Sequence, residues 1–334
     1  MDNKLREQFF EQLNEEIVQL IDPKTGLIKT EYTKVIPCPL CDSKLGVHEK
    51  LFEKNGFIFV RCRSCSLIFT NPQINQDIVE RLYEDSKSAT LWSKLQNSPS
   101  EASWKLNYFK ENLKNICNYL PEKHKYNLLD IGCSNGNFLE IVREEKPSWS
   151  LRGIDLSQEA VKIARGKNLS VDIVKFEDFK SYEPIDVMTL FGVIEHLPNP
   201  KVLLTQVKDF AAKQGSPVTV SAVVPNAYSL YHMMLQQKSV SFDGRDHLVY
   251  YSEKTLHDLF EKVGFKKIKI DTVLDGLTAI KRQMQWVDPY NYNYDGDEFF
   301  PNENFKNFLN SDEFVEIMNK FNLGLRLRII AEIG

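Results

Sequence analysis

The segment Leu128–Leu139 is the richest in residues that could bind a ligand. It reads Leu-Leu-Asp-Ile-Gly-Cys-Ser-Asn-Gly-Asn-Phe-Leu, which predicts a buried parallel strand, a tight turn at Gly132 and a helix that begins near Gly136. Asp130 comes directly before the turn. An acid there would repel a pyrophosphate, because a dinucleotide-binding loop offers N–H groups and a helix N-terminus to negative charge. The loop therefore favours a ligand that is nucleotide-like but cationic.

A second acid lies at the end of the next predicted strand. Asp155 closes the segment Trp149–Asp155. Its spacing from Asp130 is typical of the acid that hydrogen-bonds a ribose diol in a doubly wound sheet. A solvated acid at a strand end is the simpler alternative, but the position within the pattern favours ligand binding.

Four of the six cysteines form two Cys-x-x-Cys pairs near the N-terminus. Twenty residues separate the pair Cys38 and Cys41 from the pair Cys62 and Cys65, and a hairpin over 51–61 would join them. This spacing predicts four thiolates around one Zn²⁺. A closed site of this kind would stabilise a module too small to fold on its own core and would take no part in the chemistry. A redox pair, a disulfide and another metal are the alternatives.

Composition and charge limit the classes of partner that the chain can have. Its 334 residues are 42% hydrophobic, enough for one sizeable core with a smaller module beside it. The 42 Lys and Arg residues against 46 Asp and Glu residues give a net charge of −4, and no long basic run occurs, which disfavours binding of RNA. The N-terminus resembles no signal sequence, and no window is apolar enough to span a membrane. We therefore expect a soluble cytoplasmic protein without a membrane partner.

The wider pattern indicates an α/β protein. From 126 onward predicted strands alternate with helices, which specifies a parallel sheet with helices on both faces. The strands are expected at 128–131, 151–154, 171–174, 187–191, 218–223, 267–271 and 324–332. The expected domains are an N-terminal helix within 1–34, a zinc ribbon at 35–73, a helical linker or lid at 74–122 and a catalytic domain at 123–334 with an insertion at 276–323.

Two of the N-terminal segments have alternative interpretations. The helix expected over Lys4–Ile21 carries an apolar stripe, which either packs on the chain itself or joins two copies in a homodimer. The polar segment Ser86–Trp104 is either a plain linker, which we favour, or a lid over the ligand.

These segments, in this order, resemble the class I S-adenosylmethionine-dependent methyltransferases. The resemblance runs from about Lys125 to about Thr272 and rests on LLDIGCSNGNFL, GIDLS, FED at Phe176–Asp178, FGVIEHLPNP at Phe191–Pro200 and DHLVYYSEKTLHDLFEKVGF at Asp246–Phe265. The stretch Cys62–Pro72 is similar to the zinc ribbon that precedes methyltransferase domains acting on sugars and other small metabolites. The resemblance implies a Rossmann-like seven-stranded sheet, mostly parallel with the last strand antiparallel, beside a small N-terminal zinc-ribbon module.

The same resemblance implies a site for S-adenosyl-L-methionine. Asp130 and the loop Gly132–Gly136 would hold the methionine portion, Asp155 the ribose, and Phe176–Asp178 would lie beside the adenine. The full set of expected cofactor residues is Asp130, Gly132, Cys133, Ser134, Gly136, Phe138, Asp155, Leu156, Phe176, Glu177, Asp178, Phe191 and Gly192. Ser134 departs from the family's pattern of three glycines, and a serine fits there if its φ is negative.

Three residues are candidates for a base that deprotonates an acceptor. Glu195 and His196 follow the fourth predicted strand, at the carboxyl edge of the sheet where ligands collect. His247 lies in the long loop after the fifth strand, and either histidine has a suitable unperturbed pKa, although His196 could instead only hydrogen-bond its own loop. The expected substrate-facing neighbours of His247 are Arg245, Asp246, Tyr250 and Tyr251. Arg245 could clamp an acceptor phosphate or carboxylate, or simply be solvated.

The favoured function is transfer of a methyl group to a small acceptor, with a hydroxyl of a nucleotide-linked sugar in glycan or natural-product biosynthesis as the preferred class. One alternative is an rRNA or tRNA methyltransferase that binds RNA through its ribbon, which the acids of the ribbon (Asp42, Glu49 and Glu53) disfavour. The other is a non-catalytic scaffold that only binds S-adenosylmethionine, and the intact acids Asp130 and Asp155 argue against it.

Overall fold

The computed structural model describes residues 2–44, 46–75, 77–78, 80–81, 86–96, 98–273, 304, 307–308 and 311–334. The chain divides into two compact units. The ribbon unit comprises 1–75, 225–255 and 271–328, and the sheet unit comprises 76–224, 256–270 and 329–334. Each unit is therefore assembled from separate stretches of sequence.

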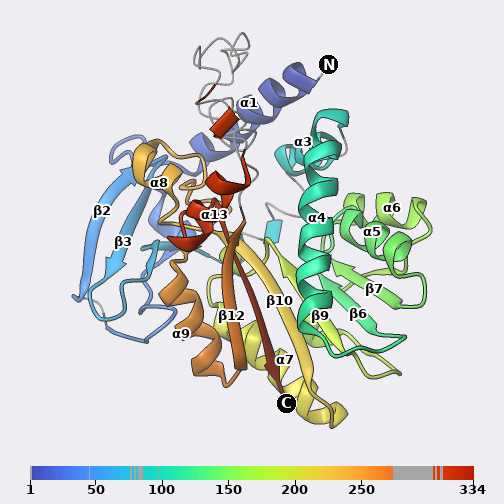
Figure 1. Ribbon diagram of the computed structural model, residues 1–334. Coiled ribbons are helices and arrows are strands. Elements are labelled where there is room, and N and C mark those ends of the chain that lie inside the picture. The colour runs from blue at the N-terminus through green and yellow to red at the C-terminus, as the bar shows by residue number, and fades with distance from the viewer. Residues whose placement is uncertain are drawn as a thin grey trace. The chain divides into compact units, whose positions relative to one another are not determined.

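A seven-stranded sheet forms the centre of the sheet unit (Figure 1), with the strand order β12-β13-β10-β9-β6-β7-β8. Its strands are β6 Asn127–Ile131, β7 Ser150–Asp155, β8 Val171–Ile173, β9 Val187–Phe191, β10 Val218–Pro225, β12 Lys266–Val273 and β13 Arg326–Ile333. The strands β8, β7, β6, β9 and β10 pair in parallel, and the last strand, β13, is antiparallel. This confirms the α/β fold and the mostly parallel sheet that the sequence predicts.

Helices precede and separate these strands. They are α3 Lys87–Gln96, α4 Pro99–Tyr119, α5 Asn137–Glu145, α6 Gln158–Gly166, α7 Pro200–Gln214 and α9 Glu253–Val263. Ile116 of α4, Val142 of α5 and Val161 of α6 pack in one apolar cluster with Leu128 of β6. Burial of these apolar faces, more than helix propensity, stabilises the three helices on the sheet.

The parallel strands place their following loops at one edge of the sheet. The loop 132–136 follows β6, and the short 3-10 helices η2 Phe176–Asp178 and η3 Ile194–His196 come after β8 and β9. In open α/β sheets ligands bind at this carboxyl edge. The residues expected to bind the cofactor are thus brought to the same edge by topology.

The ribbon unit contains a second sheet, of four strands in the order β11-β4-β3-β2. The strands β2 His48–Lys54, β3 Phe57–Cys62 and β4 Ile68–Thr70 are contributed by the cysteine-rich segment, and β2 and β3 form its hairpin. The fourth strand, β11 Val249–Tyr250, pairs antiparallel with β4 through Val249 opposite Phe69. The sequence does not predict this pairing, which joins the loop after β10 to the cysteine-rich segment in one sheet.

The remaining elements of the ribbon unit are short apart from one helix. They are α1 Asp2–Leu20, the paired strands β1 Thr33–Lys34 and β5 Gln73–Ile74, the 3-10 helices η1 Thr30–Tyr32 and η4 Gln236–Lys238, α8 Leu230–Leu235 and α13 Asp312–Lys320. Of the insertion expected at 276–323, only 304, 307–308 and 311–323 are among the described residues. None of the helices among the described residues is long and apolar enough to cross a membrane.

Candidate functional site

The turn after β6 depends on two glycines with positive φ. Gly132 has φ 72° and Gly136 has φ 71°, and Gly136 caps the N-terminus of α5. A Cβ on Gly132 would lie 2.7 Å from Cγ2 of Val193, and one on Gly136 would lie 2.4 Å from Cδ1 of Leu169. Both positions therefore require glycine for backbone conformation and for space, as expected from the sequence.

Ser134, the third position of interest in this turn, has φ 49°. The condition of a negative φ is therefore not met, and the serine occupies the left-handed region. Its backbone N–H donates to Oδ2 of Asp155 at 2.8 Å. This hydrogen bond helps to hold a conformation that costs a non-glycine residue about 1–2 kcal/mol.

Four of the five N–H groups of the turn 132–136 are used within the protein. Those of Gly132 and Cys133 donate to the carbonyl of Ile154 at 2.8 and 3.1 Å, and that of Gly136 donates to the carbonyl of Cys133 at 2.9 Å. Together with the N–H of Ser134, these are the donors that a pyrophosphate-binding loop would offer to its ligand. This turn instead presents carboxylates.

Asp130 is the first of these carboxylates. It is 3% exposed, and its Oδ1 accepts a hydrogen bond from the hydroxyl of Thr189 on β9 at 2.6 Å. Burial, and to a lesser extent the charge of Asp155, raise the pKa of Asp130 to about 7, although the Thr189 hydrogen bond lowers it. A cationic group beside this carboxyl would favour its ionised form.

Asp155 is the second carboxylate, at the end of β7. Its Oδ1 accepts the N–H of Ser157 at 2.8 Å and its Oδ2 that of Ser134. Burial raises the pKa of Asp155, and these backbone hydrogen bonds oppose that rise. Each oxygen retains a lone pair that could accept a hydrogen bond from a hydroxyl group.

Several expected cofactor residues direct their side chains into the core. The thiol of Cys133 is buried, and a Cβ on Gly153 would lie 2.7 Å from its Sγ. The ring of Phe138 is buried against Phe191, with centroids 4.9 Å apart, while Phe109 packs 5.7 Å from Phe138. Packing of the turn explains these side chains without a ligand.

The other expected cofactor residues lie in the loops after β7, β8 and β9. Leu156 is half-buried and Gly192 is exposed. Phe176 is buried against Phe210 of α7 with ring centroids 5.9 Å apart, and exposed Glu177 accepts a hydrogen bond from Gln206 at 3.0 Å. Asp178 is exposed. Phe176 and Glu177 also line an open cavity of about 740 Å³ in the sheet unit.

Asn135 lies within the turn, and the sequence does not predict its contacts. Its Oδ1 accepts a hydrogen bond from the hydroxyl of Ser93 on α3 at 3.0 Å, and its Nδ2 donates to the carbonyl of Ser93 at 3.2 Å. Both residues are buried. An amide side chain in a glycine-rich turn was the available signal, but its partner could not be read from the sequence.

Glu195 and His196 both belong to η3, at the carboxyl edge of the sheet. The side chain of Glu195 is 3% exposed, and Nε2 of His196 is 3.9 Å from its Oε1. Among the described residues, Oε2 of Glu195 is buried without a hydrogen-bond partner. A buried acceptor in this state has the chemistry to take a hydrogen bond from a ligand.

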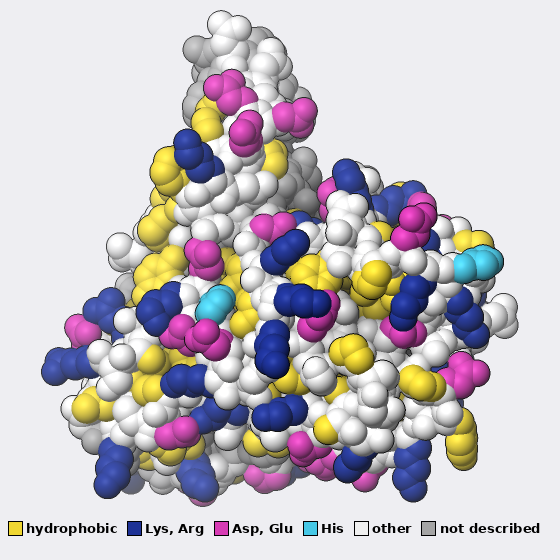
Figure 2. All heavy atoms as spheres, turned by 60° about the horizontal axis from the view of Figure 1, so that its bottom comes forward, with side chains coloured by type: hydrophobic (Ala, Val, Ile, Leu, Met, Phe, Trp, Pro, Cys, Tyr) yellow, Lys and Arg dark blue, Asp and Glu magenta, His cyan; other side chains and the backbone are white. Residues whose placement is uncertain are grey.

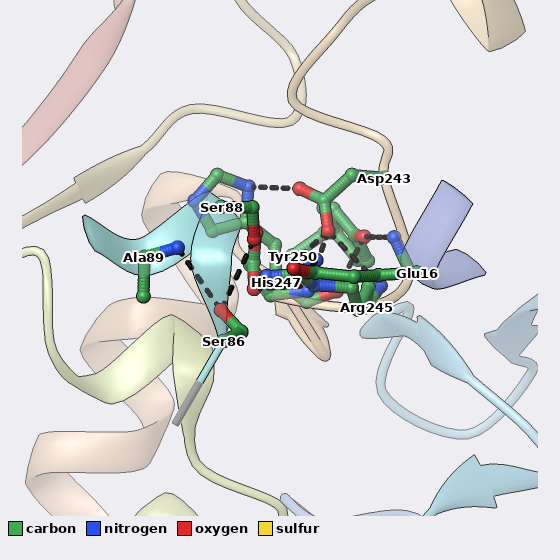
Figure 3. A network of polar contacts seen from close by, with 10 residues as sticks. Glu16, Ser86, Ser88, Ala89, Asp243, Arg245, His247 and Tyr250 are labelled. Atoms are coloured by element: carbon green, nitrogen blue, oxygen red, sulfur yellow. Dashed lines mark hydrogen bonds and ion pairs between the residues drawn. The ribbon is translucent and has the colours of Figure 1, made fainter. Parts of the chain in front are cut away.

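His247, the third candidate base, belongs to the ribbon unit. Its Nδ1 lies 2.9 Å from Oδ2 of Asp243 (Figure 3). The same nitrogen is 2.9 Å from the carbonyl of Ser241. The hydroxyl of Tyr250 donates to the carbonyl of His247 at 2.5 Å and accepts the N–H of Gly244 at 3.2 Å. Asp243 was not among the expected site residues, since a single acid in a loop carries no pattern of its own.

The expected substrate residues beside His247 are mostly buried within the ribbon unit. Arg245 is 4% exposed, and its guanidinium pairs with Glu16 of α1 at 2.8 Å and with Asp246 at 3.1 Å. Tyr250 and Tyr251 are buried as well. Arg245 thus has a structural role, because its buried charge is paired with two carboxylates.

The four cysteines of the N-terminal pairs converge. Their Sγ atoms all lie within 4.8 Å of one another, with Cys38 3.5 Å from Cys65 and Cys41 3.6 Å from Cys62. All four are free thiols and form no disulfide. The cluster therefore has the arrangement of a metal-binding site rather than of two cross-links.

The two cysteine pairs adopt the same backbone conformation. Cys38 accepts the N–H of Asp42 and donates to the carbonyl of Ser43, and Cys62 likewise accepts the N–H of Ser66 and donates to the carbonyl of Leu67. Asp42 and Ser66 have φ 59° and 67°. Each pair thus forms one knuckle, and the two knuckles are equivalent.

Known proteins resemble this chain over its central part. It is 27% identical over 110 residues to a ubiquinone biosynthesis O-methyltransferase of Idiomarina loihiensis, covering 30% of this chain and 44% of that protein. It is 25% identical over 175 residues to a tRNA U34 carboxymethyltransferase of Psychromonas ingrahamii, covering 50% and 52%. The chain thus spans about half the length of these curated relatives.

Among solved structures, a SAM-dependent methyltransferase from Archaeoglobus fulgidus aligns with 20% identity and a TM-score of 0.44, over 68% of this chain and 94% of the other. A family model described as a methyltransferase domain matches residues 93–270. This match takes in the turn after β6, Asp130, Asp155 and η3, and it covers more than half of the 334 residues. The chain therefore belongs to the methyltransferase domain family.

Proposed function

We propose that this chain transfers a methyl group from S-adenosylmethionine to a hydroxyl of a small acceptor. The observation that carries the proposal is the turn after β6. Four of its N–H groups are used internally, while Asp130 and Asp155 are left at the carboxyl edge of the sheet. Such a turn suits a ligand with a cationic end and a ribose, and it disfavours a pyrophosphate.

The two acids fit different parts of this donor. Asp130 accepts one hydrogen bond, from Thr189. Its remaining lone pairs would accept hydrogen bonds from the ammonium group of the methionine portion. Asp155 would accept the ribose hydroxyls, and Phe176 and Glu177 would lie beside the adenine. The donor supplies a methyl group that its sulfonium charge already activates, so the protein has to align the acceptor, exclude water and remove a proton.

His247 is the proposed base for that proton. Its Nδ1 lies beside two hydrogen-bond acceptors, Asp243 and the Ser241 carbonyl, which favours the tautomer that is protonated on Nδ1. Glu195 and His196 are the rival candidates, from the sheet unit. A hydroxyl acceptor needs a base of this kind, because its pKa lies far above neutrality.

A small acceptor is favoured over RNA. Three of the curated relatives are named as ubiquinone biosynthesis O-methyltransferases, which supports a hydroxyl, whereas one relative is named for tRNA. Basic and acidic side chains are interspersed on the face in Figure 2, and the net charge is −4, unlike a protein that tracks a polyanion. A nucleotide-linked sugar is our preferred acceptor, in glycan or natural-product biosynthesis, and a homodimer formed through α1 is a further proposal.

Calorimetry and product analysis test this function. Asp155→Ala should abolish binding of S-adenosylmethionine, while Asp172→Ala, which changes an acid of β8 paired with Arg152, should retain it. Incubation with pools of hydroxylated metabolites should yield a product heavier by one methylene group, detected by mass spectrometry. Unchanged affinity of Asp155→Ala, or methylation of RNA in place of every small acceptor, would contradict the proposal.

We also propose that the cysteine cluster binds one structural Zn²⁺. Four thiolates are a donor set that zinc prefers, and tetrahedral bonds of about 2.3 Å require sulfur separations of about 3.8 Å. The separations of 3.5 and 3.6 Å, and the equivalence of the two knuckles, support this ligand set. The metal would stabilise the ribbon unit and take no part in methyl transfer.

Metal analysis tests the zinc proposal. The purified chain should contain one zinc per molecule, and Cys41→Ser should lose it, whereas Cys117→Ser on α4 should retain it. A chelator should lower the unfolding temperature and leave the affinity for S-adenosylmethionine unchanged, because the proposed donor site belongs to the sheet unit. A purified chain that contains no zinc and is fully stable would contradict the proposal.

A further inference from the structure

Ser43 lies directly beside the cysteine cluster, within the ribbon unit. Its hydroxyl oxygen is 3.1 Å from Sγ of Cys62 and accepts a hydrogen bond from the thiol of Cys41 at 3.3 Å. The two sulfurs belong to different knuckles. Among the described residues they are the hydrogen-bond partners of the Ser43 side chain, and this residue is half-buried. One hydroxyl group thus bridges the two halves of the cluster.

We propose that Ser43 is a positioning residue of the zinc site, whose hydroxyl donates a hydrogen bond to the thiolate of Cys62 when the metal is bound and thereby slows release of the metal. This inference rests on the proposed zinc binding. A zinc ligand is a thiolate, so metal binding displaces the proton of the Cys41 thiol, which leaves to solvent. Of these three groups only the hydroxyl of Ser43 then carries a proton, and a thiolate can only accept a hydrogen bond from it.

The equivalence of the two knuckles shows that their backbone conformation does not require a serine at 43. The carbonyl of Ser43 accepts the N–H of Cys38 at 3.1 Å, and in the other knuckle the carbonyl of Leu67 accepts the N–H of Cys62 at 2.9 Å. Ser43 and Leu67 thus occupy matching positions, each five residues after the first cysteine of its pair. The leucine makes the same backbone contact without a hydroxyl. The side chain of Ser43 therefore has a role other than closing the knuckle.

Burial of the cluster gives weight to each hydrogen bond that it accepts. Cys38 and Cys62 are both 0% exposed, and four thiolates around one Zn²⁺ carry two negative charges in excess of the metal's two positive charges. Buried charge is costly unless hydrogen-bond donors surround it. Two backbone N–H groups of its own knuckle hydrogen-bond each of these two sulfurs. Ser43 adds a further donor to Cys62, from the opposite knuckle.

Transfer of zinc from the purified chain to an excess of a chromogenic chelator tests this role. Loss of a hydrogen bond to a metal ligand typically weakens metal binding by 10–100-fold, so Ser43→Val should release zinc about tenfold faster or more. Ser43→Thr introduces a side chain of the same shape that retains a hydroxyl, and it should release zinc at nearly the wild-type rate. Ser43→Ala removes the hydroxyl without adding volume and should behave as Ser43→Val does. Ser64→Ala, which removes an exposed hydroxyl of the other knuckle, should leave the rate unchanged.

Cobalt substitution provides a second readout, at the sulfur atoms themselves. Co²⁺ bound by thiolates has an absorption band in which an electron moves from sulfur to the metal. A hydrogen bond to the thiolate moves that band to shorter wavelength, because it stabilises the electrons on sulfur. The band of Ser43→Val should therefore lie at longer wavelength than that of the wild-type chain, and the band of Ser43→Thr should lie close to it. Packing alone would not produce this pattern, since the two substituted side chains have the same shape.

The possible results separate this inference from the zinc proposal. A chain that contains no zinc and takes up no Co²⁺ would overturn both. Normal zinc content, with the release rate and the absorption band unchanged in Ser43→Val, would overturn the role of Ser43 alone. Faster release from Ser43→Val and Ser43→Thr alike, with an unmoved band in both, would reveal a packing role at this position and would likewise overturn the hydrogen bond.

Discussion

Thr189 donates its hydroxyl proton to Asp130 across 2.6 Å, and neither side chain is more than 3% exposed. The two residues are register partners on β9 and β6. Burial raises the pKa of Asp130 and this hydrogen bond lowers it. Water cannot reach this buried carboxylate to solvate its charge, so the hydrogen bond from Thr189 helps to keep it ionised.

Thr189→Val should weaken binding of S-adenosylmethionine about tenfold. The substitution removes a hydrogen bond to a charged group, worth about 1.5–3 kcal/mol, and about 1.4 kcal/mol corresponds to tenfold in Kd. Calorimetric titration measures the change. Thr219→Val, at a threonine of β10 that is the register partner of Val187, is the matched control, and equal affinities for the two variants would contradict the role of Thr189.

The affinity for S-adenosylmethionine should rise with pH up to about 7. The folded pKa of Asp130 is about 7 against an ordinary value of 3.8, so between these values the folded chain retains a proton that the unfolded chain has lost. Stability of the unliganded chain therefore falls as pH rises through this window. The cationic ligand favours the ionised carboxyl, so its binding should release protons below about pH 7. Calorimetry in buffers of different ionisation enthalpy measures that release, which Asp130→Asn should abolish.

Ser134→Gly should stabilise the chain by up to about 1 kcal/mol, because it relieves a left-handed serine at φ 49°, less the extra entropy of glycine in the unfolded chain. Chemical denaturation followed by circular dichroism measures the difference. The comparison is Ser157→Ala, which removes the side-chain cap of α6 and should destabilise by about 1 kcal/mol. A destabilised Ser134→Gly would show that the serine hydroxyl contributes contacts of its own.

Ser93→Ala should loosen α3 from the turn after β6. It leaves Oδ1 of Asn135 buried without its donor, which costs about 1–3 kcal/mol. Hydrogen exchange over 87–96 should then accelerate, while Lys94→Ala, at an exposed position of the same helix, should leave it unchanged. If exchange is already fast in the wild-type chain, the Ser93 contact does not hold the helix.

Local sequence determined the parts of the site that could be predicted. The turn after β6 combines a buried apolar run, glycines at defined offsets and an acid, and each feature acts on its immediate neighbours. Gly132 and Gly136 have the positive φ expected of them. The positive φ of Ser134 could not be predicted, because a serine side chain disfavours that conformation. The hydrogen bond from its N–H to Asp155 depends on a strand further along the chain.

The parts that could not be predicted depend on contacts between distant segments. An arginine in a loop is expected to be solvated or to bind an acidic group of the substrate. Arg245 is instead buried and paired with Glu16 of α1. Asp243 matters because the loop turns its carboxylate towards His247, and neither spacing nor residue type fixes that turn. The pairing of β11 with β4 likewise requires partners that no periodicity connects.

That last pairing has a consequence for how the chain is made. The ribosome completes β2, β3 and β4 long before it reaches Val249 and Tyr250, and until then β4 has an open hydrogen-bonding edge. The cysteine-rich segment is therefore expected to emerge as an unfinished sheet, exposed to mispairing with other nascent chains. A fragment that ends at 73 would keep that edge permanently, so the segment is a poor candidate for excision or transplantation, despite its compact sequence signature.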